Sequence, residues 1–225
     1  GSSHFLCRPV CMTEASAPRA LVAFLSDAYG LQVAATARLS GENENFLLTT
    51  TDGARFVFKL AEAGTSRELI EMEHAMAEAA SGLALSFPRI VPTSDGDIAP
   101  IFASSSGDER VGRLLEFVEG TAWGEAGNPS KTLLRDAGRV IAELATTLGP
   151  IDLTPARRTH RWDLMSAEGP RNNVGLIEDR ERQRLVVHAF RLWAAVQPDL
   201  WTVPGNGLIH GDLNDENVLV EGDRV

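Results

Sequence analysis

The sequence predicts an α+β fold, with an antiparallel sheet in the first half of the chain and mainly helices in the second. Alternating apolar residues and the turn dipeptide Asp52-Gly53 indicate a meander of strands. Beyond Gly120, apolar residues recur at helical spacing instead. A chain of 225 residues can bury a sizeable core, as one large domain or two small ones.

The first half is predicted to alternate helices and strands. Apolar residues at helical spacing predict a helix over 18–29, which Gly30 ends. A second helix begins at Ser66 and continues to about Ser81. A polar turn is expected at 104–110. The expected strands are 32–39, 46–51, 55–60, 87–92, 98–103 and 113–118.

The second half is predicted to hold two long helices and one short strand. The helices cover 130–148, ended by Gly149-Pro150, and 178–197, stopped by Pro198. The strand covers 218–220. From these patterns we expect three parts, namely a leader or expression tail at 1–12, a sheet-rich part at 13–118 and a helical part at 119–225.

The charge balance excludes some partners. The chain has 21 Lys and Arg against 31 Asp and Glu, a formal net charge of −10, so we expect no nucleic-acid partner. No apolar run approaches the length of a membrane span, so we expect no membrane partner. Cys7 and Cys11 both lie in the tail, which leaves no disulfide framework. We therefore expect a cytoplasmic protein.

The most informative segment is 210–217, which reads His-Gly-Asp-Leu-Asn-Asp-Glu-Asn. Asp212 and Asn217 stand five residues apart in a short loop between strand-like segments. Phosphoryl transfer to a hydroxyl needs such a pair, because a carboxylate orients the hydroxyl and an amide oxygen helps to hold Mg²⁺. A polar turn without function is the alternative. We favour function because His-Gly-Asp with Asn at this offset is rare by chance.

This segment resembles the catalytic loop of the aminoglycoside phosphotransferase and choline kinase superfamily. Within it, the run 208–219 is most similar to hydroxylysine kinases, and also to kinase-like domains fused to aminotransferases. The resemblance implies a protein-kinase-like two-lobe fold, with the nucleotide bound by the N-lobe. It also implies Asp212 as the catalytic residue and Asn217 as a metal ligand. His210 then supports the geometry of the loop.

The resemblance also implies the cofactors and substrates. Mg²⁺ is the expected metal and ATP or GTP the phosphoryl donor, with GTP used by hydroxylysine kinases. The acceptor is expected to be a small hydroxylated amine, with 5-hydroxylysine as the first candidate. An aminoglycoside, homoserine or choline-type kinase is an alternative. So is a non-catalytic nucleotide-binding domain of a larger protein.

The nucleotide site is expected in the first half. Lys59 lies near the end of a strand, after a polar loop and before a helix. A solvent-facing lysine is the alternative, but in kinase-like folds the lysine at this place reaches the α- and β-phosphates. At 100° per residue Glu73 falls within the apolar stripe of the following helix, whereas Glu71 falls outside it. Because a buried carboxylate needs a partner, we expect Glu73 to pair with Lys59.

Two further segments are expected to contact the nucleotide. The loop 40–45 would cradle phosphates with backbone N–H groups, and we assign Ser40, Gly41 and Asn43 to this role. Phe117 and Val118 fall where the two lobes should join, and we assign them to the purine.

One residue of the family pattern is expected beyond Val225. The family has a second metal-binding aspartate on the strand that follows the catalytic loop, and the chain ends before such a strand. We therefore expect a C-terminally truncated kinase, with an incomplete C-lobe. On this view the 225-residue chain turns over little nucleotide, and a longer form is active.

Overall fold

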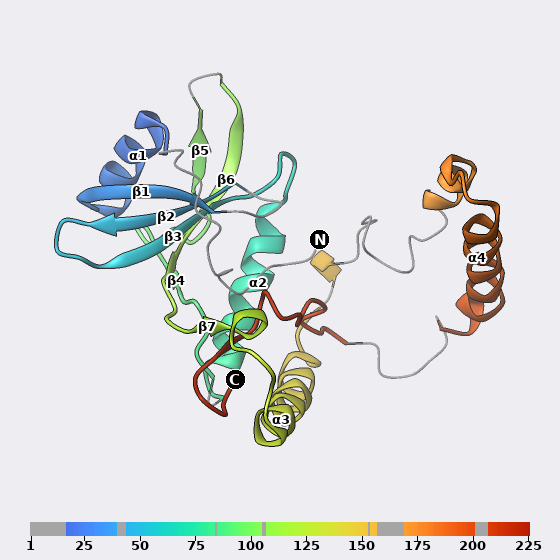
Figure 1. The fold of residues 1–225 in the computed structure, drawn as a ribbon. Helices are drawn as coiled ribbons and strands as arrows, with labels where there is room; N and C mark the ends of the chain where they lie inside the picture. The colour runs from blue at the N-terminus through green and yellow to red at the C-terminus, as the bar shows by residue number, and fades with distance from the viewer. Residues whose placement is uncertain are drawn as a thin grey trace.

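The computed structural model describes residues 17–39, 44–83, 85–104, 107–152, 154–156, 169–200 and 207–225. An antiparallel sheet occupies the first half and helices dominate the second, as predicted (Figure 1). The principal strands are β1 (Val33–Leu39), β2 (Glu44–Thr50), β3 (Arg55–Leu60), β6 (Glu109–Glu116) and β4 (Ile90–Val91), in that spatial order.

The predicted strand meander is confirmed. β1 pairs with β2 and β2 with β3, both antiparallel. Gly53 has φ 87° in the turn between β2 and β3, and its N–H donates to the carbonyl of Thr50 at 3.0 Å. A positive φ favours glycine, which explains why the Asp-Gly dipeptide marked this turn.

Capping residues mark where two of the helices begin. The four α-helices are α1 (Arg19–Tyr29), α2 (Arg67–Ala80), α3 (Lys131–Leu148) and α4 (Arg180–Leu200). Ser66 and Ser130 cap α2 and α3, accepting hydrogen bonds from the backbone N–H of Leu69 and Leu133 at 3.3 and 3.0 Å. Both helices begin within one residue of the predicted place.

The two faces of the sheet have different neighbours. Leu21 and Leu25 of α1 pack on Phe58 and Leu114, which point to one face from β3 and β6. The alternate residues Val57 and Leu115 point to the opposite face and form a separate apolar cluster. Lys59 shares the alternation of Val57, so it lies on the face away from α1.

A second core joins α2 to α3. Met72 and Met76 of α2 pack against Val140 and Leu144 of α3, together with Leu208 near the C-terminus. α4 packs against the 3₁₀ segment η4 (Gly169–Leu176), and Figure 1 shows this pair apart from the sheet, α2 and α3. Within the described segments, no helix has both the length and the apolar character needed to cross a bilayer.

Some predicted boundaries differ from the structure, and one strand was not predicted. β6 begins at Glu109, within the predicted turn, because β5 (Ile101–Ala103) pairs with it and extends the strand. A two-residue strand, β7 (Thr121–Ala122), pairs with β8 (Leu219–Val220), a ladder too short to show periodicity. α4 continues through Pro198 to Leu200, since a proline near a helix end removes only one intrahelical bond.

Candidate active site

Asp212 and Asn217 are in direct contact in the loop that precedes β8. The Asn217 Nδ2 group donates to Oδ2 of Asp212 at 2.7 Å and to its backbone carbonyl at 3.0 Å. The amide nitrogen must face these two acceptors, because the reversed amide would place an oxygen against a carboxylate. The predicted pair therefore forms one structural unit.

The oxygen of the Asn217 amide is the second notable atom of this unit. Asn217 is 1% exposed, and its Oδ1 has no hydrogen-bond partner among the described residues. A buried amide oxygen without a partner is costly, so such atoms usually have a function. An amide oxygen beside a carboxylate fits the oxygen-rich coordination that Mg²⁺ prefers.

Neighbouring side chains fix the orientation of the Asp212 carboxylate. Asn214 donates from Nδ2 to Oδ1 of Asp212 at 2.9 Å, so each carboxylate oxygen accepts a side-chain hydrogen bond. The Asn214 Oδ1 atom in turn accepts from the backbone N–H groups of Glu216 and Asn217, both at 3.0 Å. His210 accepts at Nδ1 from the backbone N–H of Asp212 at 3.3 Å, a contact that supports the loop.

The segment after Gly120 holds the C-terminal half of this loop. Trp123 and Gly124 donate backbone hydrogen bonds to the carbonyls of Val218 and Asp215, both at 2.9 Å. Gly120 has φ 151°, and a Cβ atom there would lie 2.9 Å from Cβ of Leu219. Only glycine permits this approach, so the connection between the two halves of the chain also supports the candidate catalytic loop.

The predicted phosphate-binding lysine is buried. Lys59 is 5% exposed, so it is not a solvent-facing strand lysine. The register of β3 and β6 places Lys59 directly opposite Arg113, which is 7% exposed. Two cations therefore stand side by side on the face of the sheet that lies away from α1.

Glu73 is also buried, and it contacts Arg113. The geometric choice of Glu73 is supported, because Glu73 is 4% exposed whereas Glu71 is exposed. Oε2 of Glu73 forms an ion pair with Nη1 of Arg113, a partner that the sequence analysis did not consider. The pairing of Glu73 with Lys59 stays a prediction, and Arg113 is a further partner of the same carboxylate, which the strand register places opposite Lys59.

The sequence pattern did not identify Arg113 as a partner of Glu73, because the two residues lie far apart in the chain. Within β6 it sits among the apolar residues of a strand, where an arginine stem packs readily. Burial lowers the pKa of Arg113 to about 10, well below its usual range, because desolvation disfavours the charged form. That pKa still leaves the guanidinium protonated at pH 7, as its carboxylate partner requires.

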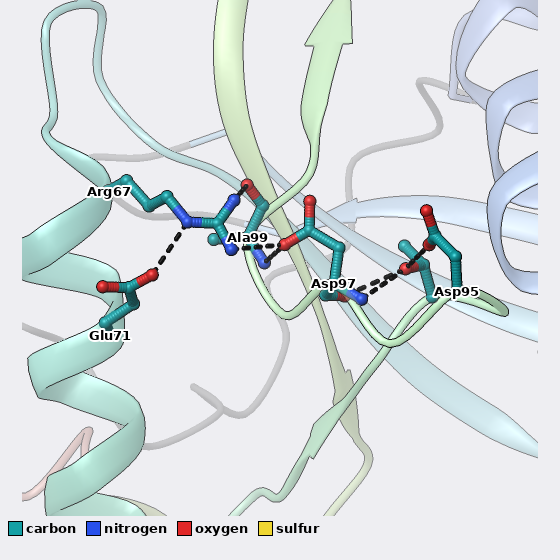
Figure 2. Close-up of polar contacts among 6 residues, drawn as sticks. Arg67, Glu71, Asp95, Asp97 and Ala99 are labelled. Carbon is teal, nitrogen blue, oxygen red and sulfur yellow. Dashed lines mark hydrogen bonds and ion pairs between the residues drawn. The ribbon is translucent and has the colours of Figure 1, made fainter.

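A polar cluster anchors the start of α2, the helix that carries Glu73 (Figure 2). Arg67 donates from Nε to Glu71 at 2.8 Å and from Nη2 to Asp97 at 2.7 Å. Oδ1 of Asp97 also accepts from the backbone N–H of Ala99 at 2.9 Å. The hydrogen bond from Arg67 is the main reason that the pKa of Asp97 lies below its usual 3.8.

Of the two residues assigned to the purine, one lines a cavity. Val118 lines a cavity of about 260 Å³, together with Leu213 and Leu219 from the catalytic-loop segment. Phe117 packs at the edge of the Val57 cluster, and the guanidinium of Arg55 lies 4.1 Å from the centre of its ring. The predicted phosphate-loop residues Ser40, Gly41 and Asn43 lie outside the described residues.

Comparison with known proteins establishes the family. Residues 36–225 match the model of the APH phosphotransferase enzyme family. The chain belongs to this family. Among curated proteins, hydroxylysine kinase of Danio rerio is 26% identical to this family member over 206 residues. That match covers 87% of this chain and 58% of the relative, so the chain spans less than two thirds of the relative's length.

Solved structures support the fold of this phosphotransferase family member. An amicoumacin kinase in complex with AMP-PNP, Ca²⁺ and Ami has a TM-score of 0.56 and 16% identity, over 76% of this chain and 52% of that one. A microcompartment-associated aminopropanol kinase has a TM-score of 0.50 and 19% identity, over 67% and 47%. These matches confirm the predicted α+β, kinase-like fold.

Proposed function

We propose that the protein transfers the γ-phosphate of ATP or GTP to a hydroxyl of a small amino compound. The observation that carries the proposal is the Asp212–Asn217 unit, in which a fixed carboxylate adjoins a buried amide oxygen that has no partner within the described part of the chain. Family membership supports a phosphotransferase acting on small molecules.

Asp212 is the proposed catalytic residue. Its carboxylate would accept a hydrogen bond from the acceptor hydroxyl, orient the oxygen toward the γ-phosphate and take up the hydroxyl proton. The hydrogen bonds from Asn214 and Asn217 hold the carboxylate in one orientation before substrate arrives. Direct in-line transfer needs no covalent enzyme intermediate.

Asn217 is the proposed metal ligand of this chain. Its Oδ1 atom would coordinate Mg²⁺, with phosphate oxygens and water as further ligands. Mg²⁺, when bound, supplies positive charge beside the phosphate oxygens. The Asn217 Nδ2 group meanwhile holds the Asp212 carboxylate, so one side chain would serve both the metal and the catalytic residue.

The nucleotide would lie between the two proposed lobes, 13–118 and 119–225. Lys59 would contact the phosphates, as would backbone N–H groups of Ser40, Gly41 and Asn43. Phe117 and Val118 would contact the purine through their backbone. The place of Lys59 near the end of β3 and before α2 supports this role, because the lysine at this place in kinase-like folds reaches the phosphates.

For the acceptor we propose 5-hydroxylysine or a close relative. The similarity to a hydroxylysine kinase supports this choice. An aminoglycoside, homoserine or choline-type acceptor is the alternative within the enzyme class, and a non-catalytic nucleotide-binding domain is the alternative outside it.

A coupled nucleotide assay tests the proposal. The full-length protein would be supplied with Mg²⁺, ATP or GTP, and one acceptor from a panel of 5-hydroxylysine, homoserine, choline and an aminoglycoside. Lysine, which lacks the hydroxyl, is the matched negative control. We expect turnover with 5-hydroxylysine and none with lysine. Nucleotide binding without turnover on any acceptor would instead favour the non-catalytic domain.

A further inference from the structure

Three charged residues from three elements meet away from solvent. Lys59 of β3, Arg113 of β6 and Glu73 of α2 are 5%, 7% and 4% exposed. Charged side chains are almost never this buried unless they are paired. The proposed reaction gives a role to Lys59, of which Glu73 is the predicted partner, but it gives none to Arg113.

The strand register fixes the relative positions of the two cations. Lys59 and Arg113 are direct cross-strand partners, so their Cβ atoms lie about 5 Å apart on one face of the sheet. Like charges directly opposite each other repel. Glu73 approaches from α2 and contacts Arg113 through Oε2.

Stability alone does not explain why β6 carries an arginine at this position. Replacing a buried ion pair by apolar residues of similar volume is often neutral or stabilising. The neighbours of Arg113 on the same face of β6 are the apolar Val111 and Leu115, both buried. An apolar side chain would suit this environment, so the charge of Arg113 has another use.

We propose that Arg113 is a positioning residue for the phosphate-binding lysine. Arg113 binds Oε2 of Glu73 and so fixes this carboxylate beside β6. Its positive charge keeps the Lys59 ammonium from turning toward β6, so the ammonium is directed to the polyphosphate. This role rests on the proposed function of the site. Without Arg113, the whole carboxylate would draw Lys59 toward α2 and away from the nucleotide.

The substitution Arg113→Met tests this role, because methionine keeps the length and loses the charge. Binding of AMP-PNP and GMP-PNP with Mg²⁺ would be measured by calorimetry, beside binding of adenosine and guanosine. We expect the Kd of the preferred triphosphate analogue to rise at least tenfold, while the Kd of its nucleoside changes less than twofold. If Arg113 had a purely structural role, the substitution would weaken the binding of both ligands or of neither. Either result would overturn the inference.

Companion variants keep the test decisive. If Arg113→Met fails to fold, Arg113→Gln keeps a hydrogen-bond donor beside Glu73 and still removes the charge. It should show the same tenfold loss for the triphosphate analogue alone, and wild-type affinity in this variant would refute the role. Arg113→Lys retains a cation beside Glu73, so we expect its affinity to lie within about threefold of wild type.

Arg110→Met is the matched control. Arg110 lies on the same strand but on the other face, where it pairs with Glu44 at 3.0 Å. The affinity of the Arg110→Met variant for the triphosphate analogue should equal that of wild type. Wild-type protein that binds neither analogue would overturn the proposed function, and this inference with it. Wild-type binding with an unaffected Arg113→Met variant would overturn only the inference.

Discussion

Asn217 donates from one nitrogen to both the side chain and the backbone carbonyl of Asp212, at 2.7 and 3.0 Å. The proposed catalytic carboxylate and the proposed metal-binding amide are thus joined by direct hydrogen bonds. A change at either residue should disturb the other, and the first two predictions separate these effects.

Asp212→Asn should abolish most phosphotransfer while nucleotide still binds. The amide cannot take up the hydroxyl proton, so we expect kcat to fall by about 10²–10⁴-fold. The oxygen of the new amide can still accept from Asn217, whereas its NH₂ group would face the Asn214 donor, so one hydrogen bond is lost. The backbone contacts to Oδ1 of Asn214 should still hold the loop, and the nucleotide Kd should stay within about threefold. Steady-state kinetics and calorimetry provide the two measurements. Asp215→Asn, an exposed carboxylate in the same loop, is the control. Unchanged turnover in Asp212→Asn would remove Asp212 from the mechanism.

Asn217→Ala should reduce both stability and the response to Mg²⁺. The substitution removes two hydrogen bonds to Asp212, and we expect a loss of about 1–3 kcal/mol in the free energy of unfolding. Nucleotide binding should also lose its dependence on Mg²⁺. Urea denaturation and binding titrations with and without Mg²⁺ measure these effects. The exposed Asn173→Ala is the control. Full Mg²⁺ dependence in Asn217→Ala would exclude Asn217 as a ligand.

Gly112→Ala should destabilise the sheet. A Cβ atom at Gly112 would lie 2.5 Å from Cζ of Phe58, which is fully buried. Overpacking of this kind costs about 1–3 kcal/mol. Gly138→Ala is the matched control on α3, where a Cβ atom would meet nothing within 4 Å. Since alanine favours helix, this control should gain about 0.5–1 kcal/mol. Equal effects of the two substitutions on denaturant midpoints would contradict the packing at Gly112.

The Arg67–Asp97 contact should make stability depend on acid pH. Because Arg67 lowers the folded-state pKa of Asp97 below 3.8, the pair stabilises the protein above about pH 4. That contribution is lost as pH falls through the folded-state pKa. We expect Arg67→Met to lower the thermal midpoint by about 1–3 °C at pH 7, a small effect because the pair is partly exposed.

The difference in thermal midpoint between wild type and Arg67→Met should then become smaller as the pH falls below 4. Arg135→Met, an exposed arginine on α3, should show no pH-dependent difference. If the difference in thermal midpoint between wild type and Arg67→Met stays constant from pH 7 to pH 3, then Arg67 does not act by stabilising the ionised Asp97 carboxylate.

The sequence by itself determined the features that depend on near neighbours. Ser66 and Ser130 mark helix starts because a cap contacts a residue three positions ahead. The Asp52-Gly53 turn and the inward position of Glu73 follow from local geometry and helical period. Asp212 and Asn217 were recognisable together because only five positions separate them.

Only the tertiary structure decided the contacts between distant segments. Glu73 and Arg113 are 40 positions apart, and they meet because β6 pairs beside β3 under α2. The same applies to the early start of β6, which its pairing with β5 extends, and to the β7–β8 ladder. Such contacts depend on strand register and helix packing, and neither leaves a periodic signal in the residues that make them.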